Sequence, residues 1–497
     1  MSAGRYQSDE EPKVIKLKVM IEKSRNRVIF AESDHEFIDT LFSFLTLPLG
    51  TVLRLLEKDM VQLGSISRIY ASVYSLEPRF LRTSYCKSML IMPRSASEVQ
   101  CAKLKLNVDH SEIAGKLFVC SSFDPCRNLF GISQSSLCFN CDNLMQCPKR
   151  IYEKEEKRSS GEESVVGVFL KGGAASFMIT DDLQVMPAST ASLTALFGKL
   201  GISDKNEIEA KTIEVGTKEV VQLLKFSLLS KTPLTNMVLN SQGNNWMKDI
   251  SRFEDNQTAK LDKKAATSQN LNSMSMKLIF SKSKKKVLYA EAGVKLVDFL
   301  FSFLVLPLGA VVKHLGGNSR LGCIDNLYKG AVDLSSENYI KSEECKDMLI
   351  SPKLFPHSGF DGHILKVGEE YPKYRSVGYG RLEIVTNANK SEEEASDLAI
   401  ILDPKSPTGK TIKGEGYLKG PATFMILDNL LVTPFSPTSI ITQLNQMKVS
   451  TTDVEERTVI VGKDEALNLL KASLISKTVL NDVFNTREPY PKVMLKV

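Results

Sequence analysis

Apolar and polar residues alternate along the chain from Leu17 to Phe30, on either side of a polar stretch at residues 23–27. An alternation of period two that is broken by a short polar segment predicts a β-hairpin, because successive side chains of a strand face opposite sides of a sheet. Ser33 and Glu36 then stand at the spacing of a capping box, followed by apolar residues at helical intervals. They predict that a helix with a broad apolar face starts here.

Proline and glycine divide the next segment into separate helices. Pro48 and Gly50 predict the end of the first helix and a sharp turn into a second, and apolar residues at helical spacing over 66–74 predict a third. The Met-Leu-Ile run near Cys86 predicts a short strand. Farther along, residues 177–185 predict another hairpin that turns at an Asp-Asp pair, and a final strand and helix complete the pattern.

This succession of elements occurs twice. Residues 17–56 align without a gap onto residues 276–315, with 18 identities in 40 positions, and residues 218–232 match residues 464–478 at nine of 15 positions. What recurs is apolar core and turn sequence, so the duplication predicts architecture and no particular chemistry. Short hairpins mixed with helices, without regular βαβ alternation, predict an α+β domain present in two tandem copies.

The segment between the two repeats is polar, poor in apolar side chains and without a counterpart, as is typical of a flexible linker. The predicted organisation is a disordered N-terminus at 1–13, a first repeat domain at 14–240, a linker at 241–275, a second repeat domain at 276–486 and a C-terminal tail at 487–497.

The composition is that of an ordinary globular protein, with 42% hydrophobic and 25% charged residues. The net charge of +6 is small for 497 residues and does not select a class of partner. The polar, acidic start lacks the pattern of a secretory signal, and the most apolar run, residues 41–53, is too short to span a bilayer. We therefore expect a cytoplasmic or nuclear protein without a membrane span.

Cysteine spacing gives the sharpest chemical signal. Four of the nine cysteines lie in the part of the first repeat that has diverged from the second: Cys120, Cys126, Cys138 and Cys141. Two cysteine pairs can place four thiolates at the tetrahedral corners that zinc prefers, and the second pair has CxxC spacing. The first pair is more widely spaced than usual, so a loop of free thiols is the alternative.

A fifth cysteine, Cys147, is the reserve ligand of this predicted site. The corresponding stretch of the second repeat, residues 371–389, contains no cysteine. Any zinc would therefore be structural and would belong to the first repeat alone.

No pattern of catalytic residues recurs in the two repeats. Cys86 and Cys345 correspond, and we interpret both as buried small side chains. Asp39 and Asp298 also correspond, and a role on the helix surface is favoured over a polar pocket. The five histidines have no counterparts where the alignment is clear, which disfavours a duplicated histidine-dependent site. We therefore predict no catalytic residue and no cofactor besides the zinc.

The tip of the first hairpin is basic in both repeats, KSRNR at 23–27 and KSKKK at 282–286. These tips could engage nucleic acid or an acidic ligand, through Lys23, Arg25, Arg27, Lys284, Lys285 and Lys286. The alternative is a solvated turn, because no aromatic platform for unpaired bases accompanies them.

The sequence VIFAE, then DxLFSFLxLPLG, LKGxxxFMI and a late LLKxSLxSKT, resembles the plant-restricted family catalogued as domain of unknown function 674. The resemblance covers nearly the whole chain in both repeats. It implies a plant origin, a tandem-repeat build and paired cysteines in the region around Cys120 to Cys141. It implies no activity, substrate or catalytic residue.

These observations favour a non-catalytic binding or scaffold protein whose partner is another protein. Two alternatives stay open. The first is an enzyme with a site between the two repeats, and the second is a zinc-stabilised nucleic-acid-binding protein.

Overall fold

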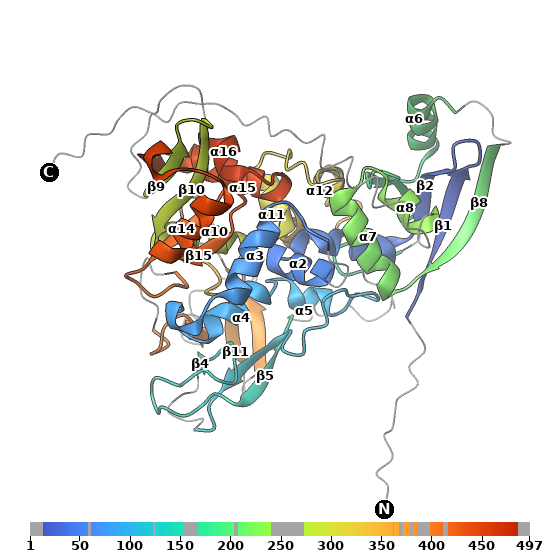
Figure 1. Cartoon of the computed structure of the whole chain (residues 1–497). Helices are drawn as coiled ribbons and strands as arrows, with labels where there is room; N and C mark the ends of the chain where they lie inside the picture. Colours follow the sequence, from blue (N-terminus) through green and yellow to red (C-terminus); the bar gives the residue numbers. More distant parts are fainter. Residues whose placement is uncertain are drawn as a thin grey trace, which may run out of the picture.

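The computed structural model has both helices and sheets, and the α+β class is confirmed (Figure 1). It describes residues 13–57, 61–122, 126, 128–153, 167–173, 175–202, 207–239, 273–360, 362–366, 371–377, 381–385, 398–410 and 416–485. We call the described residues up to 239 the first half and those from 273 onward the second half.

The first half contains a five-stranded antiparallel sheet built around the predicted hairpin. Its strands, in spatial order, are β7 (Val185–Pro187), β6 (Phe177–Thr180), β2 (Arg27–Ser33), β1 (Ile15–Glu22) and β8 (Ile208–Val215). In β1 the apolar residues Leu17 and Val19 are buried while Lys16 and Lys18 are exposed, as the alternation predicts.

The second half contains a five-stranded sheet with strands in the corresponding order. They are β15 (Val432–Pro434), β14 (Thr423–Leu427), β10 (Lys286–Gly293), β9 (Met274–Ser281) and β16 (Val454–Val461). Both predicted hairpins of each half are therefore confirmed.

Helices pack between and around the two sheets. In the first half they are α1 (His35–Ser43), η1 (Phe44–Thr46), α2 (Leu49–Glu57), α3 (Ile66–Ser75), η2 (Pro78–Phe80), α4 (Tyr85–Ile91), α5 (Glu98–Cys101), α6 (Thr190–Leu200), α7 (Thr217–Leu229) and α8 (Pro233–Leu239). In the second half they are α10 (Val294–Ser302), η4 (Phe303–Val305), α11 (Leu308–His314), α12 (Ile324–Asp333), α13 (Glu343–Ile350), α14 (Pro437–Gln446), η7 (Thr451–Asp453), α15 (Lys463–Ile475) and α16 (Val479–Phe484).

Two local predictions are wrong. The cap of α1 is Asp34, whose side chain accepts a hydrogen bond from the backbone N–H of Glu36, so the predicted capping box of Ser33 and Glu36 does not form. The Met-Leu-Ile run after Cys86 is helical and belongs to α4, and its counterpart belongs to α13. Four or five apolar residues in a row do not distinguish a strand from a buried helix.

The two halves exchange helices. Helix α3 of the first half packs against β15 and α10 of the second half, and α12 of the second half packs against β7 and α1 of the first half. In Figure 1, α3 accordingly lies beside α10 and β15, while α12 lies toward α7 and α8. Hydrogen bonds join the exchanged parts, from Val432 N–H to the Ser72 hydroxyl at 2.8 Å and from the Asn326 side chain to the Asp182 carbonyl at 2.9 Å.

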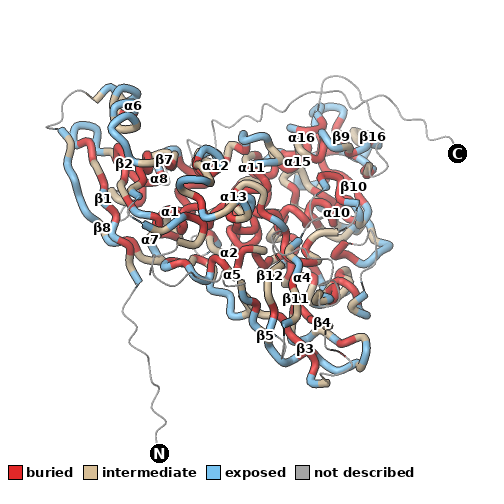
Figure 2. The backbone as a smooth tube through the Cα atoms, turned by 180° about the vertical axis from the view of Figure 1, so that it is seen from behind, coloured by how far each residue is buried: buried red, intermediate tan, exposed pale blue. Residues whose placement is uncertain are grey.

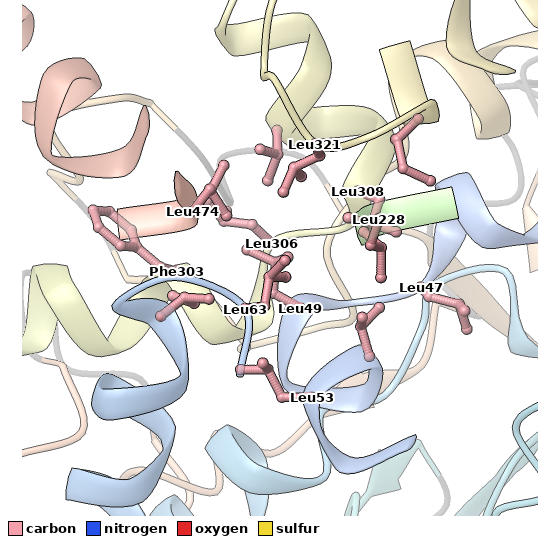
Figure 3. Packing of buried hydrophobic residues seen from close by; sticks show 14 of the residues in the cluster. Leu47, Leu49, Leu53, Leu63, Leu228, Phe303, Leu306, Leu308, Leu321 and Leu474 are labelled. Carbon is pink, nitrogen blue, oxygen red and sulfur yellow. The ribbon is translucent and has the colours of Figure 1, made fainter. Parts of the chain in front are cut away.

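The halves meet at the two Leu-Pro-Leu turns that the sequence repeats. Pro48 and Pro307 form an isolated β-bridge, in which Leu49 N–H donates to the Leu306 carbonyl at 2.9 Å and Leu308 N–H to the Leu47 carbonyl at 3.0 Å. Figure 3 shows these leucines among packed apolar side chains from both halves. One apolar core thus runs from the first sheet through this point to the second sheet, as the buried positions in Figure 2 show.

Two glycines permit the close approach of the halves. Gly64 and Gly322 both have φ of +48°, and a Cβ on Gly64 would lie 2.5 Å from the backbone of Leu474. A Cβ on Gly322 would lie 2.3 Å from the carbonyl oxygen of Ser227. Glycine is therefore required at each position for two reasons: the backbone is left-handed, and a side chain would collide with the opposite half.

The divergent middles of the two halves combine into one further unit, which we call the middle lobe. It consists of the cysteine loop (residues 120–141), a four-stranded sheet and a two-stranded sheet, and it lies at the bottom of Figure 1. The strands are β11 (Lys373–Val377), β12 (Arg381–Val385), β5 (Cys147–Tyr152), β3 (Lys116–Val119), β13 (Ile400–Ile401) and β4 (Leu129–Phe130). Parallel pairs β5–β12 and β4–β13 join the halves.

Several predicted boundaries fall on residues outside the described set. These are the N-terminus at 1–13 except residue 13, the linker at 241–275 except residues 273–275, and the tail at 487–497. Met274 and Ser275 belong to β9. The two repeat domains, 14–240 and 276–486, remain a prediction. Within the described residues, no helix has both the length and the apolar character needed to span a bilayer.

Candidate metal centre

The cysteine loop is shaped by short backbone pairings. Cys120 directly follows β3, and Phe118 in that strand pairs with Gly131 beyond β4. Cys138 N–H donates to the Asn143 carbonyl at 3.0 Å, and Asp142 N–H donates to the Cys138 carbonyl at 2.8 Å. These bonds make a tight turn that carries the CxxC pair on one side.

The structure brings all four predicted cysteines together. The sulfur of Cys126 lies 3.4 Å from that of Cys138 and 3.6 Å from that of Cys141, and the Cys141 sulfur lies 3.7 Å from that of Cys120. All four sulfurs lie within 4.8 Å of one another. Tetrahedral bonds of about 2.3 Å to one zinc ion place the sulfurs about 3.8 Å apart. The thiols are thus close to the spacing that a zinc site with four cysteine ligands requires.

The thiols of the cluster differ in acidity. Burial raises the pKa of Cys126 and of Cys120, whereas a hydrogen bond from the Asn143 backbone lowers the pKa of Cys141 to about 7. Cys141 is therefore the first thiolate available to a cation, and a bound divalent ion would promote loss of the other protons. Apolar residues surround the group, among them Leu129, Met145 and Leu402.

The reserve ligand does not join this cluster. Cys147 is exposed at the start of β5, where it pairs with Val119, and it is absent from the group of converging sulfurs. The cysteine-free stretch of the second half, residues 371–389, supplies β11 and β12 to the same lobe in its described part. This stretch of the second half thus contributes two strands to the lobe, and the four clustered thiols come from the first half.

The recurrent aspartates have a different role from the one expected. Asp39 is 2% exposed, and its carboxylate accepts backbone N–H bonds from Val168, Phe169 and Leu170 at 2.6, 3.0 and 2.9 Å. Asp298 is also buried and accepts bonds from Tyr417 and Leu418. The predicted surface role is wrong. Both side chains fix the segment that leads into the LKG motif of their own half.

Burial opposes ionisation of these carboxyls. It raises the pKa of Asp39 to about 6 and that of Asp298 to about 7, although the backbone N–H bonds favour the charged form. Cys345 of the second half lies near the Asp39 site of the first half, since its sulfur contacts the Val168 carbonyl at 3.9 Å. Cys86 and Cys345 are buried, as expected.

One pair of side chains that was not predicted from the sequence resembles a nucleophile and its base. Ser302 Oγ and His363 Nε2 lie 2.8 Å apart in the core. Leu365 N–H donates to Nδ1 of His363, so Nδ1 is unprotonated and Nε2 carries the proton in the neutral ring. Burial lowers the pKa of His363 to about 4. The imidazole therefore donates to Ser302, which in turn donates to the Phe299 carbonyl, and it cannot accept the serine proton.

No sequence signal marks this pair. The two residues are 61 positions apart, and His363 has no counterpart in the first half where the alignment is clear.

The two basic tips lie at opposite ends of the molecule, at the β1–β2 and β9–β10 turns (Figures 1 and 2). Their charges are partly compensated locally. Arg27 Nε lies 2.6 Å from the Glu22 carboxylate, Arg25 lies 3.5 Å from the same group, and Lys23 lies 3.7 Å from Glu209. On the other tip, Lys284 Nζ donates to the Met447 carbonyl. One extended ligand cannot bridge both tips without crossing the whole protein.

The fold and the cysteine cluster define an α+β protein with a candidate zinc centre in a lobe shared by its halves. The sequence matches the family described as protein of unknown function (DUF674) over residues 11–464, and the chain belongs to this family. No curated protein and no solved structure matches the chain.

Proposed function

We propose that this chain is a non-catalytic binding protein whose middle lobe is stabilised by one structural zinc ion. The convergence of Cys120, Cys126, Cys138 and Cys141 is the observation that supports the zinc. Four cysteine ligands complete the coordination of zinc, whereas catalytic zinc sites keep one position open for water or substrate. The ion would therefore hold the loop and activate no water.

The contents of the lobe explain why zinc is useful there. The apolar cluster around the cysteines is small, and three of its seven fully buried members are the cysteines Cys120, Cys126 and Cys138 themselves. A small core leaves little hydrophobic free energy to order a loop, and metal ligation commonly supplies what is missing.

The buried polar groups support a non-catalytic reading. Asp39 and Asp298 are occupied by backbone N–H groups, and His363 is held in the tautomer that cannot activate Ser302. A carboxylate or imidazole committed in this way organises backbone and is not poised for proton transfer. The alternative of an enzyme with a site between the halves gains no support from these residues.

The proposal includes a tandem duplication in a plant protein of the cytoplasm or nucleus. The corresponding strand orders of the two sheets and the 18 identities in the first 40 aligned positions support duplication. The plant origin rests on the family resemblance. All nine cysteines are free thiols, which suits a reducing compartment and suits zinc binding.

Elemental analysis of the purified full chain tests the zinc. We expect about one zinc per chain, and we expect none after the double substitution Cys138→Ser and Cys141→Ser. The matched control is Cys147→Ser, which should keep the metal because this thiol lies outside the cluster. Metal-free protein that melts at the same temperature with and without added zinc would refute the structural site.

Partner capture tests the binding role. Affinity purification from plant tissue should recover the same partner with the wild type and with Cys147→Ser. Turnover of a small molecule that depends on Asp39 or Asp298 would instead establish an enzyme.

A further inference from the structure

Among the described residues, one face of the four-stranded sheet in the middle lobe is largely exposed and basic. On β5, Ile151 is buried while its neighbours Arg150 and Tyr152 are exposed, and on β12, Leu382 is buried while Arg381 is exposed. The buried residues face the apolar cluster of the lobe. We call the opposite side, which carries Arg150, Tyr152 and Arg381, the outer face.

Strand register aligns basic residues from both halves on the outer face. Lys116 of β3 pairs with Arg150 of β5. Leu382 of β12 pairs in parallel with Ile151 of β5. The residues one position earlier on these strands, Arg381 and Arg150, therefore lie next to each other on the opposite side of the sheet. The face thus carries a basic row that crosses three strands.

The fourth strand adds to this charge. Lys373 of β11 is exposed and lies on the same side as Arg381, since Val377 pairs with Arg381 and successive side chains alternate. Glu383 is the acidic residue among these positions, beside Tyr152. Arg375 of β11, which pairs with Glu383, lies on this side too. Among the described residues, five cationic side chains therefore outweigh one carboxylate.

An aromatic ring lies beside the basic row on the same face. Tyr152 is 39% exposed, and the guanidinium carbon of Arg381 lies 4.4 Å from the centroid of its ring. A guanidinium over a phenol ring presents a flat, cationic surface on which a planar base can stack. The basic tips at 23–27 and 282–286 have no such ring within them.

The cysteine loop borders this face. Phe118 projects to the same side as Lys116 but is buried in the cluster that contains Cys120, Cys126 and Cys138. The loop thus covers one end of the outer face and leaves the remainder open among the described residues.

We propose that the outer face binds single-stranded nucleic acid. Lys116, Arg150 and Lys373 contact phosphates, and one base stacks on the surface formed by Arg381 and Tyr152. Single strands suit this geometry because their bases are free to stack, and because a β-sheet face is flat and wide enough to hold several nucleotides. An acidic polypeptide would use the charges but leave the ring without a planar partner. The inference rests on the proposed function only in that zinc orders the adjacent loop.

Fluorescence anisotropy with the full, zinc-loaded chain tests this proposal. The probes are labelled single-stranded RNA and single-stranded DNA of about 12 nucleotides, within the usual range of site sizes. We expect binding to a single strand that weakens as salt rises, and weaker binding to the matching duplex. Comparison of the RNA and DNA probes identifies which strand the face prefers.

Substitutions locate the binding surface. Tyr152→Ala should weaken binding about tenfold through loss of stacking, while Tyr152→Phe should retain it. The double substitution Arg150→Gln and Lys373→Gln should reduce the slope of log affinity against log salt by about 1.4, or about 0.7 for each lost phosphate contact. The matched control is Lys285→Gln with Lys286→Gln on the second basic tip, which should bind like the wild type.

The proposal would be overturned by no binding of either probe at low salt, or by equal binding of Tyr152→Ala and the wild type. Loss of binding in the Lys285 and Lys286 control would also overturn it. So would competition by polyglutamate that is as effective as competition by the unlabelled strand. Zinc is measured in the same samples. Absence of nucleic-acid binding by zinc-loaded protein rejects this inference alone, while absence of zinc from protein that binds the probes rejects the structural metal alone.

Discussion

The two five-stranded sheets and the helices of both halves share one continuous apolar core. The middle lobe, by contrast, has only a small apolar core, formed by a few thiols and short strands. The two sheets have corresponding strand orders, and most of the described helices of one half have a counterpart in the other. The described parts of the lobe do not correspond in this way, since one half supplies the cysteine loop and the other supplies β11 and β12. A shared interior needs the same residues twice, but a binding surface is needed only once. We therefore assign the proposed binding role to the lobe.

The largest effect is expected when the chain is cut between the halves. A specific protease site placed within residues 241–272 should yield two fragments that remain together in size-exclusion chromatography. The exchanged helices α3 and α12 and the bridge between Pro48 and Pro307 bind each half to the other. Fragments that separate and each keep a cooperative melt would show that the halves fold alone, as the sequence had implied.

Equal substitutions in the two halves should have equal effects within the sheets and helices. Phe42 and Phe301 are fully buried counterparts, and replacing either with alanine should lower the free energy of unfolding by about 3 to 5 kcal/mol. Urea denaturation measures both. A cost well below this for one of the two would mean that its half packs less tightly and that the correspondence is only topological.

The counterpart aspartates should differ. Both amides from Tyr417 and Leu418 reach a single oxygen of Asp298, so an asparagine there can still accept them. Asp39 uses its second oxygen for Val168, and Asp39→Asn would set an amide group against that N–H. We expect Asp39→Asn to cost about 1 to 3 kcal/mol and Asp298→Asn less. Thermal melts at pH 8 compare them, and the reverse order would contradict the hydrogen-bond assignment.

A smaller effect should appear in the pH dependence of stability. The pKa of Asp298 is raised by burial to about 7, so between about pH 4 and 7 the folded state holds a proton that the unfolded state has released. This carboxyl therefore favours folding at low pH, and that contribution falls as pH rises through 7. Asp298→Asn should become progressively more stable relative to wild type over this window. A difference that stays constant with pH would show that the carboxyl is already ionised.

Features set by neighbouring residues were predictable from the sequence, and features set by distant residues were not. Hairpins, most helices and the cysteine cluster were predictable, because periodicity, proline, glycine and CxxC spacing are local signals. The exchange of α3 and α12 was not, since the same apolar helix face fits either of two corresponding sheets. The burial of Asp39 was missed because its partner Val168 is 129 positions away.

Hydrogen exchange on the full chain, with zinc and after chelation, tests the central claim most directly. If zinc holds the middle lobe alone, chelation should remove protection from β3 and β5 and leave β1, β2, β9 and β10 protected. Equal loss of protection across the lobe and both five-stranded sheets, or no loss in any of them, would contradict the account.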